Sequence, residues 1–142
     1  MPADLAGLAP FLGSLECGAV VTDRAGNVKW ANARLCRMLG YSSRKLLAGS
    51  LSFRPFGEHT GRTCASMWRA VLAGQVYSTG VNDRTRTGDR VPVVITLAPL
   101  ADAFARTHML LVLHSAKDTP WERRRARETA ERAMELWSSR RR

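Results

Sequence analysis

Residues 91–97 (Val-Pro-Val-Val-Ile-Thr-Leu) form the most strand-like run of the chain. Val, Ile and Thr dominate it, and these β-branched side chains fit a pleated surface but lose rotamer freedom in a helix. Upstream, Gln75–Arg86 leads into residues 87–89 (Thr-Gly-Asp), a glycine-centred turn that suits a hairpin. Downstream, Thr107–His114 has the composition of a mostly buried strand. The three runs predict an antiparallel meander, and the rest of the chain must pack against it.

A second hairpin is expected nearer the N-terminus. Gly18–Thr22 and Val28–Ala31 are short apolar runs, and the five residues between them (Asp-Arg-Ala-Gly-Asn) are turn formers. Asn32 then suits the N-cap of a helix that ends at Leu39, where Gly40 supplies a left-handed stop. This segment therefore predicts two strands followed directly by a capped helix.

Two more helices are expected between that helix and the meander. Ser42–Ala48 is short and is followed by Gly49, and Arg62–Ala73 is longer and is followed by Gly74. Residues 51–61 between them have no clear period and are predicted to form a loop. These helices are expected to cover one face of the sheet.

Amphipathic segments flank the predicted sheet on both sides. Apolar residues fall on one face of a helix predicted over Ala3–Leu15. Residues 119–122 (Thr-Pro-Trp-Glu) form a helix start, because Thr can cap, Pro fits the first position and Glu completes a capping box. The helix that follows carries one narrow apolar stripe and is expected to leave the domain.

These flanking helices are predicted to pair with a second copy of the chain. The expected dimer interface consists of Leu5, Leu8, Leu12, Ala126, Ala130, Ala133, Met134 and Trp137. On this interpretation Ala130→Glu weakens pairing and leaves the fold intact. The chain is accordingly divided into an N-terminal helix (1–16), a central domain (17–118) and a C-terminal signalling or coiled-coil helix (119–142).

Composition limits the possible function classes. A chain of 142 residues fits one domain. It has no apolar run long enough to cross a bilayer and its start does not resemble a secretory signal, so a cytoplasmic protein, or a cytoplasmic piece of a larger one, is expected. Its three cysteines are scattered without metal-ligand spacing, which favours reduced, packed thiols. The sequence places no Gly-rich phosphate loop, paired inner carboxylates or Ser/Cys-His-Asp arrangement at useful positions, so catalysis has little support.

The net charge of +10 leaves an alternative open. Residues 119–142 hold eight Arg and four Glu and so supply +4 of that charge. A basic helix attracts nucleic acid or acidic lipid electrostatically. A stand-alone protein that binds nucleic acid through this Arg-rich helix is therefore the alternative function, although the same residues also fit a solvated helix face, and a nucleic-acid partner is not expected.

Several local motifs resemble those of PAS domains in order and spacing. The matching segments are residues 28–33 (Val-Lys-Trp-Ala-Asn-Ala), 39–42 (Leu-Gly-Tyr-Ser), 46–49 (Leu-Leu-Ala-Gly), 67–75 (Met-Trp-Arg-Ala-Val-Leu-Ala-Gly-Gln), 84–93 (Arg-Thr-Arg-Thr-Gly-Asp-Arg-Val-Pro-Val) and 98–100 (Ala-Pro-Leu). The resemblance extends from about Leu15 to Thr119. The family's closing Asp-x-Thr is approximated by residues 118–120 (Asp-Thr-Pro).

The resemblance implies an α+β PAS fold, in which a five-stranded antiparallel sheet carries short helices on one face and has flanking helices at both ends. It also implies a sensor module rather than an enzyme. Such a module dimerises through its flanking helices and relays ligand or redox state to a histidine kinase, cyclase or transcription domain. A homodimer with such an output domain, in the same chain or another, is therefore expected.

The same resemblance suggests ligands without choosing one. A light-sensing LOV domain needs a Cys in the region that reads Gly49–Arg54 here, and that Cys is absent. The flavin-holding PAS domains of aerotaxis receptors place a Trp and an Asn where Trp68 and Asn82 stand. Haem needs an axial ligand, usually His.

The candidate ligand-binding residues are Trp68, Tyr77, Asn82, His108 and His114. His108 and His114 are six residues apart on one strand and so point to the same face, whereas His59 falls in the predicted loop. Each candidate also fits an ordinary structural role. The expectation is no cofactor or a small apolar ligand, with flavin and haem left open.

Overall fold

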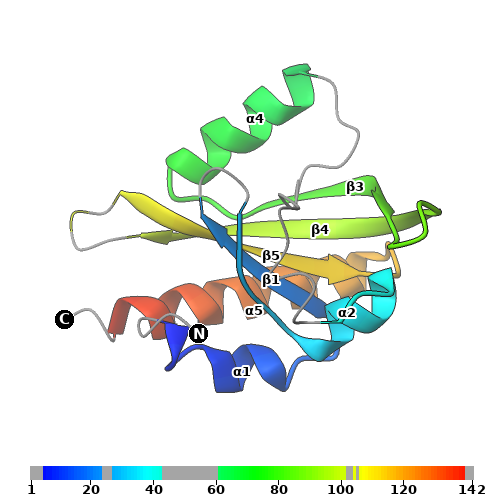
Figure 1. Ribbon diagram of the computed structural model, residues 1–142. Helices are drawn as coiled ribbons and strands as arrows, with labels where there is room; N and C mark the ends of the chain where they lie inside the picture. Colours follow the sequence, from blue (N-terminus) through cyan, green and yellow to red (C-terminus); the bar gives the residue numbers. More distant parts are fainter. Residues whose placement is uncertain (1–4, 24–26, 43–60, 102–103, 105, 140–142) are drawn as a thin grey trace.

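In the computed structural model the chain forms one antiparallel sheet between two helical layers (Figure 1). The structure describes residues 5–23, 27–42, 61–101, 104 and 106–139. The strands are β1 (Gly18–Asp23), β2 (Val28–Ala31), β3 (Tyr77–Arg84), β4 (Arg90–Ala101) and β5 (Thr107–Ser115), in the spatial order β2-β1-β5-β4-β3. The helices are α1 (Ala9–Gly13), α2 (Ala33–Leu39), α4 (Gly61–Leu72) and α5 (Pro120–Ser139).

The predicted fold class and the predicted meander are both confirmed. β3, β4 and β5 pair antiparallel in sequence order, and β1 closes the sheet by pairing with β5. The turn between β3 and β4 contains Gly88 with a φ of +92°, a conformation that favours glycine. β4 extends beyond the predicted Leu97 to Ala101, because Ala98, Pro99 and Leu100 continue the ladder with β5.

The local helix signals are also confirmed where the structure describes them. The Asn32 side chain accepts a hydrogen bond from the Leu35 N–H, and Gly40 ends α2 with a φ of +76°. The Thr119 hydroxyl accepts a hydrogen bond of 3.1 Å from the Glu122 N–H at the start of α5. The predicted helix over 42–48 and most of the predicted loop over 51–61 lie outside the described residues.

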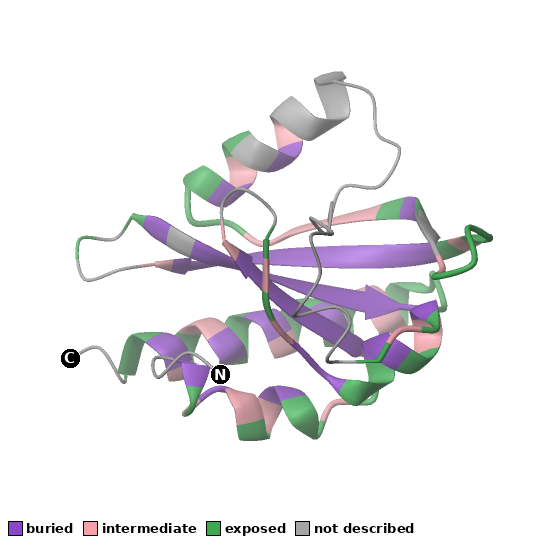
Figure 2. Cartoon of the chain, in the orientation of Figure 1, coloured by how far each residue is buried: buried purple, intermediate pink, exposed green. Residues whose placement is uncertain are grey.

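The three central strands β1, β5 and β4 are buried on both faces along most of their length (Figure 2). The inner face of the sheet packs on α2 and α4 through Val20, Val81, Val93, Ile95, Leu97, Leu110 and Val112, which meet Leu35, Leu39, Met67 and Val71. Its outer face packs on α1 and α5 through Ala19, Val21, Ala98, Leu100, Met109, Leu111 and Leu113, which meet Leu8, Leu12, Ala130, Ala133 and Trp137. Successive strand residues alternate between the two clusters, so β4 and β5 are apolar almost throughout.

The expectation that the C-terminal helix leaves the domain is wrong. α5 lies across the outer face of the sheet, where Ala130 and Ala133 are fully buried and Trp137 is 2% exposed. The Trp137 indole N–H donates a hydrogen bond of 2.7 Å to the Ala101 carbonyl at the end of β4. The apolar stripe is used within the chain because the outer sides of β4 and β5 are themselves apolar and need cover.

The N-terminal segment is likewise packed on its own chain. Leu5, Leu8 and Leu12 are each 1% exposed and belong to the outer cluster. The α-helix itself is shorter than predicted and begins at Ala9, next to Pro10, which suits a first helical turn. In this arrangement most of the proposed dimer residues are covered by their own chain, with Ala126 also buried and Met134 half-buried. Pairing with a second chain stays a prediction.

Candidate ligand and signalling sites

The inner face of the sheet is the candidate ligand-binding surface. Its buried lining consists of branched aliphatic side chains, Ala31 and Met67, with Cys36 the one thiol in the described part of this cluster. Half-buried apolar side chains surround it, among them Met38, Tyr41 and Tyr77. A lining of this composition accepts an apolar group or a flat ring and offers few polar contacts.

The structure places two of the predicted ligand residues on this inner side. Tyr77 packs half-buried against the inner cluster. His114 pairs with Ile95 across β4 and β5 and is fully buried on the same face. For Trp68 on α4 and His108 on β5 only the backbone is described, and His59 lies outside the described residues. Their proposed roles stay predictions.

Asn82 lies on the other side of the sheet. Its neighbour Val81 packs in the inner cluster opposite Val93, whereas Asn82 pairs with Pro92 and is exposed. Successive residues of a strand point to opposite faces, so Asn82 faces outward and lines a cleft there. The prediction that Asn82 bonds a ligand held between the sheet and the inner helices is therefore wrong.

Asn32 joins the inner and outer layers. Its side-chain oxygen accepts hydrogen bonds from the Ala19 N–H (3.0 Å) and the Leu35 N–H (2.9 Å). Its amide nitrogen donates to the carbonyls of Leu12 (3.0 Å) and Cys17 (3.1 Å). The side chain is 3% exposed, and it connects the end of α1, the segment before β1, β1 itself and the first turn of α2.

The local sequence around Asn32 predicts only its role as a helix cap. The links to Leu12 and Cys17 span 20 and 15 residues, so the local pattern carries no signal for them. They matter because one buried side chain joins α2, which lines the inner face, to the end of α1 on the outer face.

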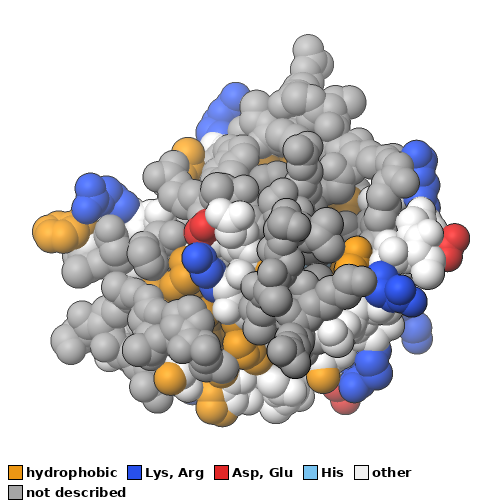
Figure 3. Space-filling model, viewed as in Figure 1, with side chains coloured by type: hydrophobic (Ala, Val, Ile, Leu, Met, Phe, Trp, Pro, Cys, Tyr) orange, Lys and Arg blue, Asp and Glu red, His pale blue; other side chains and the backbone are white. Residues whose placement is uncertain are grey.

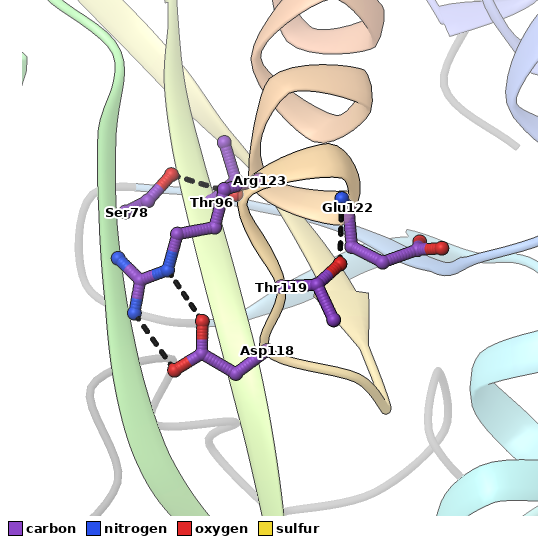
Figure 4. Close-up of polar contacts among 6 residues, drawn as sticks. All are labelled: Ser78, Thr96, Asp118, Thr119, Glu122 and Arg123. Carbon is purple, nitrogen blue, oxygen red and sulfur yellow. Dashed lines mark hydrogen bonds and ion pairs between the residues drawn. The ribbon is translucent and has the colours of Figure 1, made fainter.

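The connection between β5 and α5 is held by polar contacts (Figure 4). Arg123 Nε and Nη2 donate to the two carboxylate oxygens of Asp118 at 2.6 and 3.1 Å. These bonds lower the pKa of the Asp118 carboxyl below its ordinary value, because they favour its charged form. With the Thr119 cap, the pair fixes where α5 begins, and these are the residues that approximate the closing Asp-x-Thr.

A second cleft lies where the α1–β1 connection, α2 and the start of α5 meet. It has a volume of about 290 Å³, and Cys17, Arg34, Met38 and Arg125 are among its lining residues. Burial raises the pKa of the Cys17 thiol above its ordinary value, so the thiol is protonated at neutral pH. Within the described residues no group of three or more His, Cys, Asp or Glu could hold a metal ion.

The basic residues of α5 divide into paired and unpaired ones. Arg125 lies 3.6 Å from Glu16, and Arg132 lies 3.2 Å from Glu135, in addition to the Arg123–Asp118 pair. Within the described residues, Arg124 and Arg127 form no ion pair. On the face shown in Figure 3 the Lys and Arg side chains are scattered rather than gathered into one patch.

Comparison with known proteins gives one consistent result. The family model described as the PAS fold matches residues 12–119. No curated protein matches the chain. No helix in the described ranges is long and apolar enough to cross a membrane.

Three similar solved structures illustrate the match. A domain of a sensory box sensor histidine kinase/response regulator from Geobacter sulfurreducens is 18% identical, with a TM-score of 0.54 over 75% of this chain and 88% of that chain. A PAS domain from a two-component sensor histidine kinase is 18% identical, with a TM-score of 0.58 over 76% and 91%. The Rhodobacter sphaeroides LOV protein is 13% identical, with a TM-score of 0.65 over 96% and 95%. At these identities the likeness shows a shared fold.

Proposed function

The chain belongs to the PAS fold family, and we propose that it is a non-enzymatic cytoplasmic sensor that relays a change at the inner face of its sheet to α5. The observation that carries the proposal is that only one layer of sheet separates the inner face from α1 and α5. β5 places Leu110 and Val112 in the inner cluster and Leu111 and Leu113 in the cluster beneath α1 and α5. A single strand therefore separates the candidate ligand surface from both flanking helices.

The sensed species is a small apolar ligand, or a change of packing with no ligand. The inner lining is aliphatic, and the polar groups placed on it, Tyr77 and His114, lie in or beside that cluster. Flavin and haem stay alternatives. An aliphatic wall with a half-buried Tyr suits a flat ring as well as a metabolite. A light-driven flavin–cysteine adduct is not part of the proposal, because residues 49–54 contain no Cys.

The output is a histidine kinase, cyclase or transcription domain, in the same chain or in another, that responds to α5, and the active unit is a homodimer. Two of the similar structures come from sensor histidine kinases. Because the apolar faces of α1 and α5 are buried on the sheet, pairing through them requires these helices to loosen from it. The sensor state and the dimer state are thereby coupled.

A chimera tests the relay. The transmitter domain of a histidine kinase is joined in helical register after Ser139, and autophosphorylation is measured with Ile95→Val and Val112→Ala on the inner face. We expect each substitution to change the kinase rate, because each alters packing one strand away from α5. Leu72→Ala is the matched control, since Leu72 is 53% exposed on α4. Unchanged rates in folded inner-face variants would contradict the relay.

The bound species is identified on the purified protein. An absorbance spectrum shows a band near roughly 450 nm for flavin or roughly 400 nm for haem. Mass spectrometry of an organic extract detects a colourless apolar ligand. The inner site would be contradicted if the extract contained a polar metabolite whose binding was lost on substitution of outer-face residues and kept on substitution of inner-face residues.

A further inference from the structure

Gly80 stands in the middle of β3, where glycine weakens a strand by about 0.5–1 kcal/mol relative to Ala. Three structural reasons could require it, and none holds. Its φ is outside the positive range that favours glycine, since among the described glycines such values occur at Gly40, Gly74 and Gly88. The β3–β4 register has no bulge at this point. A Cβ added at Gly80 would meet nothing within 4 Å.

The remaining reason for a strand glycine is close approach by something outside the described chain. Gly80 lines a cleft of about 420 Å³ together with Asn82, Pro92, Val94 and Asp118. Val94, its partner across the ladder, belongs to the outer side, because Val93 and Ile95 on either side of it face inward. The open space at Gly80 is thus on the outer face of β3, the part of the sheet beyond α5.

Another cleft, distinct from the one at Cys17, continues along the same strand. It has a volume of about 460 Å³ and is lined by Val76, Tyr77, Ser78 and three arginines, Arg123, Arg124 and Arg127. The Arg123–Asp118 ion pair lies beside Ser78 and Thr96, between the two clefts (Figure 4). The two clefts follow β3 from Val76 to Asn82, a length of about 20 Å for an extended chain. We call this the β3 groove.

The charge of the β3 groove is one-sided. Asp118 is its acidic lining residue among those described, and Arg123 already neutralises it. Arg124 and Arg127 are exposed and form no ion pair within the described residues. They lie one turn apart on α5 and both line the same cleft, so their charges act on one occupant. The groove therefore selects a negatively charged occupant.

The floor of the β3 groove favours a peptide over a nucleic acid. Ser78, Gly80 and Asn82 are small or polar, and the exposed Asn82 amide carries both a donor and an acceptor that match a peptide unit. Proteins that hold single-stranded nucleic acids combine a basic groove with exposed aromatic rings on which the bases stack. Tyr77, the aromatic residue of the lining, packs toward the inner cluster instead.

We propose that the β3 groove binds an extended acidic peptide segment of a partner protein, with its backbone over Gly80 and its carboxylates at Arg124 and Arg127. Asn82 bonds the peptide backbone. This interaction is separate from ligand sensing at the inner face, since it uses the opposite side of the sheet. It also lies beside the start of α5, so a partner bound there would respond to any movement of that helix.

The test measures fluorescence anisotropy of a labelled octapeptide of alternating serine and glutamate added to the full chain. We expect Gly80→Phe to weaken binding by about tenfold or more, because the ring fills the groove without changing charge. The double variant Arg124→Gln/Arg127→Gln should lose at least as much. The matched controls are Gly13→Phe, at another glycine with open space around its Cβ position, and Arg132→Gln, farther along α5. Both should bind within about twofold of the unmodified chain.

Two comparison probes distinguish specific docking from general attraction. The serine–glutamine octapeptide should bind at least about tenfold more weakly than the glutamate peptide. Equal binding by Gly80→Phe and the unmodified chain, or equal weakening by Arg132→Gln and the double variant, would show diffuse electrostatics and overturn the proposal. So would tighter binding of a single-stranded oligonucleotide that is sensitive to the same substitutions, because the groove would then be a nucleic-acid site.

Should Gly80→Phe fail to fold by circular dichroism, Asn82→Asp takes its place. The exposed Asp adds a negative charge to the floor and removes the amide donor, so it should weaken the glutamate peptide more than the glutamine peptide. Equal effects on the two peptides would contradict the assigned position of the carboxylates.

Discussion

The two faces of the sheet are packed in different ways. The outer cluster combines large side chains, such as Trp137 and Leu111, with small ones, Ala98, Ala130 and Ala133. The inner cluster consists mainly of medium-sized aliphatic side chains. Large residues fitted against small ones specify one arrangement, whereas a more uniform aliphatic surface tolerates repacking. The comparison suggests that the outer layer determines where α5 sits and that the inner layer can adapt to a ligand.

Ala130→Glu should give the largest effect, and the structure leads us to expect damage to the fold where the sequence alone predicted that the fold stays intact. Ala130 is fully buried between α5 and the sheet, so the new carboxylate loses water without gaining a partner. We expect a loss of about 4 kcal/mol or more in the free energy of unfolding, or release of α5 from the sheet. Urea unfolding measures the loss of stability, and limited proteolysis within α5 detects release of the helix from the sheet.

Glu131→Ala is the control for that substitution, since Glu131 is exposed at the next position of α5. A stable Ala130→Glu variant with a protease-resistant α5 that only loses dimerisation would restore the original interpretation. It would also remove the basis for treating the outer layer as the rigid one.

Asn32→Ala tests the connection between the two layers and comes next in size. The substitution removes the side-chain partner of the Ala19 and Leu35 N–H groups and of the Cys17 carbonyl, whereas the Leu12 carbonyl keeps its backbone hydrogen bond from the Leu15 N–H. We expect a loss of about 3 kcal/mol in the free energy of unfolding, because buried groups without hydrogen bonds are costly. Hydrogen exchange should rise in both α1 and α2. Faster exchange in α2 alone would mean that Asn32 acts only as a helix cap.

How far the fold follows from the sequence is clearest at these same residues. The Asn32 cap, the Gly88 turn and the start of α5 at Thr119 were predictable, because each depends on chemistry within a few residues. The outer layer was not predictable in this way. The hydrogen bond from Trp137 to Ala101 joins residues 36 apart, and the apolar stripe of α5 fits a partner chain as well as the sheet.

The candidate site was predicted only in part, for a reason of register. Tyr77 and His114 reach the inner face, but Asn82 does not, because Val81 occupies the inward position next to it. The sequence could have shown that Asn82 faces away from the inner side, because an apolar Val next to a polar Asn in a strand assigns the two to opposite faces. The β3 groove depends on where α5 crosses the sheet, which no local pattern reports. The sequence indicates the groove only through Gly80, a glycine inside a strand.

Leu110 and Leu111 allow a direct comparison of the two faces. They are neighbours in β5 and are 1% and 0% exposed, and they pack in the inner and outer clusters respectively. Each substitution by Ala should cost a few kcal/mol, with Leu111→Ala costing about 1 kcal/mol more, because the outer layer relaxes less around the cavity. Chemical denaturation of both variants gives the difference. Equal costs, or a larger cost for Leu110→Ala, would contradict the adaptable inner layer.

Acidification tests the outer layer at the point where α5 begins, with the smallest expected effect. The folded-state pKa of Asp118 is lowered by the hydrogen bonds from Arg123. Its stabilisation is therefore complete above the ordinary Asp pKa of about 3.9 and disappears as the pH falls through the lower folded-state value. Asp118→Asn removes this contribution, so its thermal midpoint should fall less than that of the unmodified chain between about pH 6 and about pH 3. Glu128→Gln, an exposed carboxyl on α5, controls for loss of a negative charge. If acid instead increases amide exchange first in α2 while α5 keeps its protection, then the inner layer is tied to this ion pair and the contrast between the two faces does not hold.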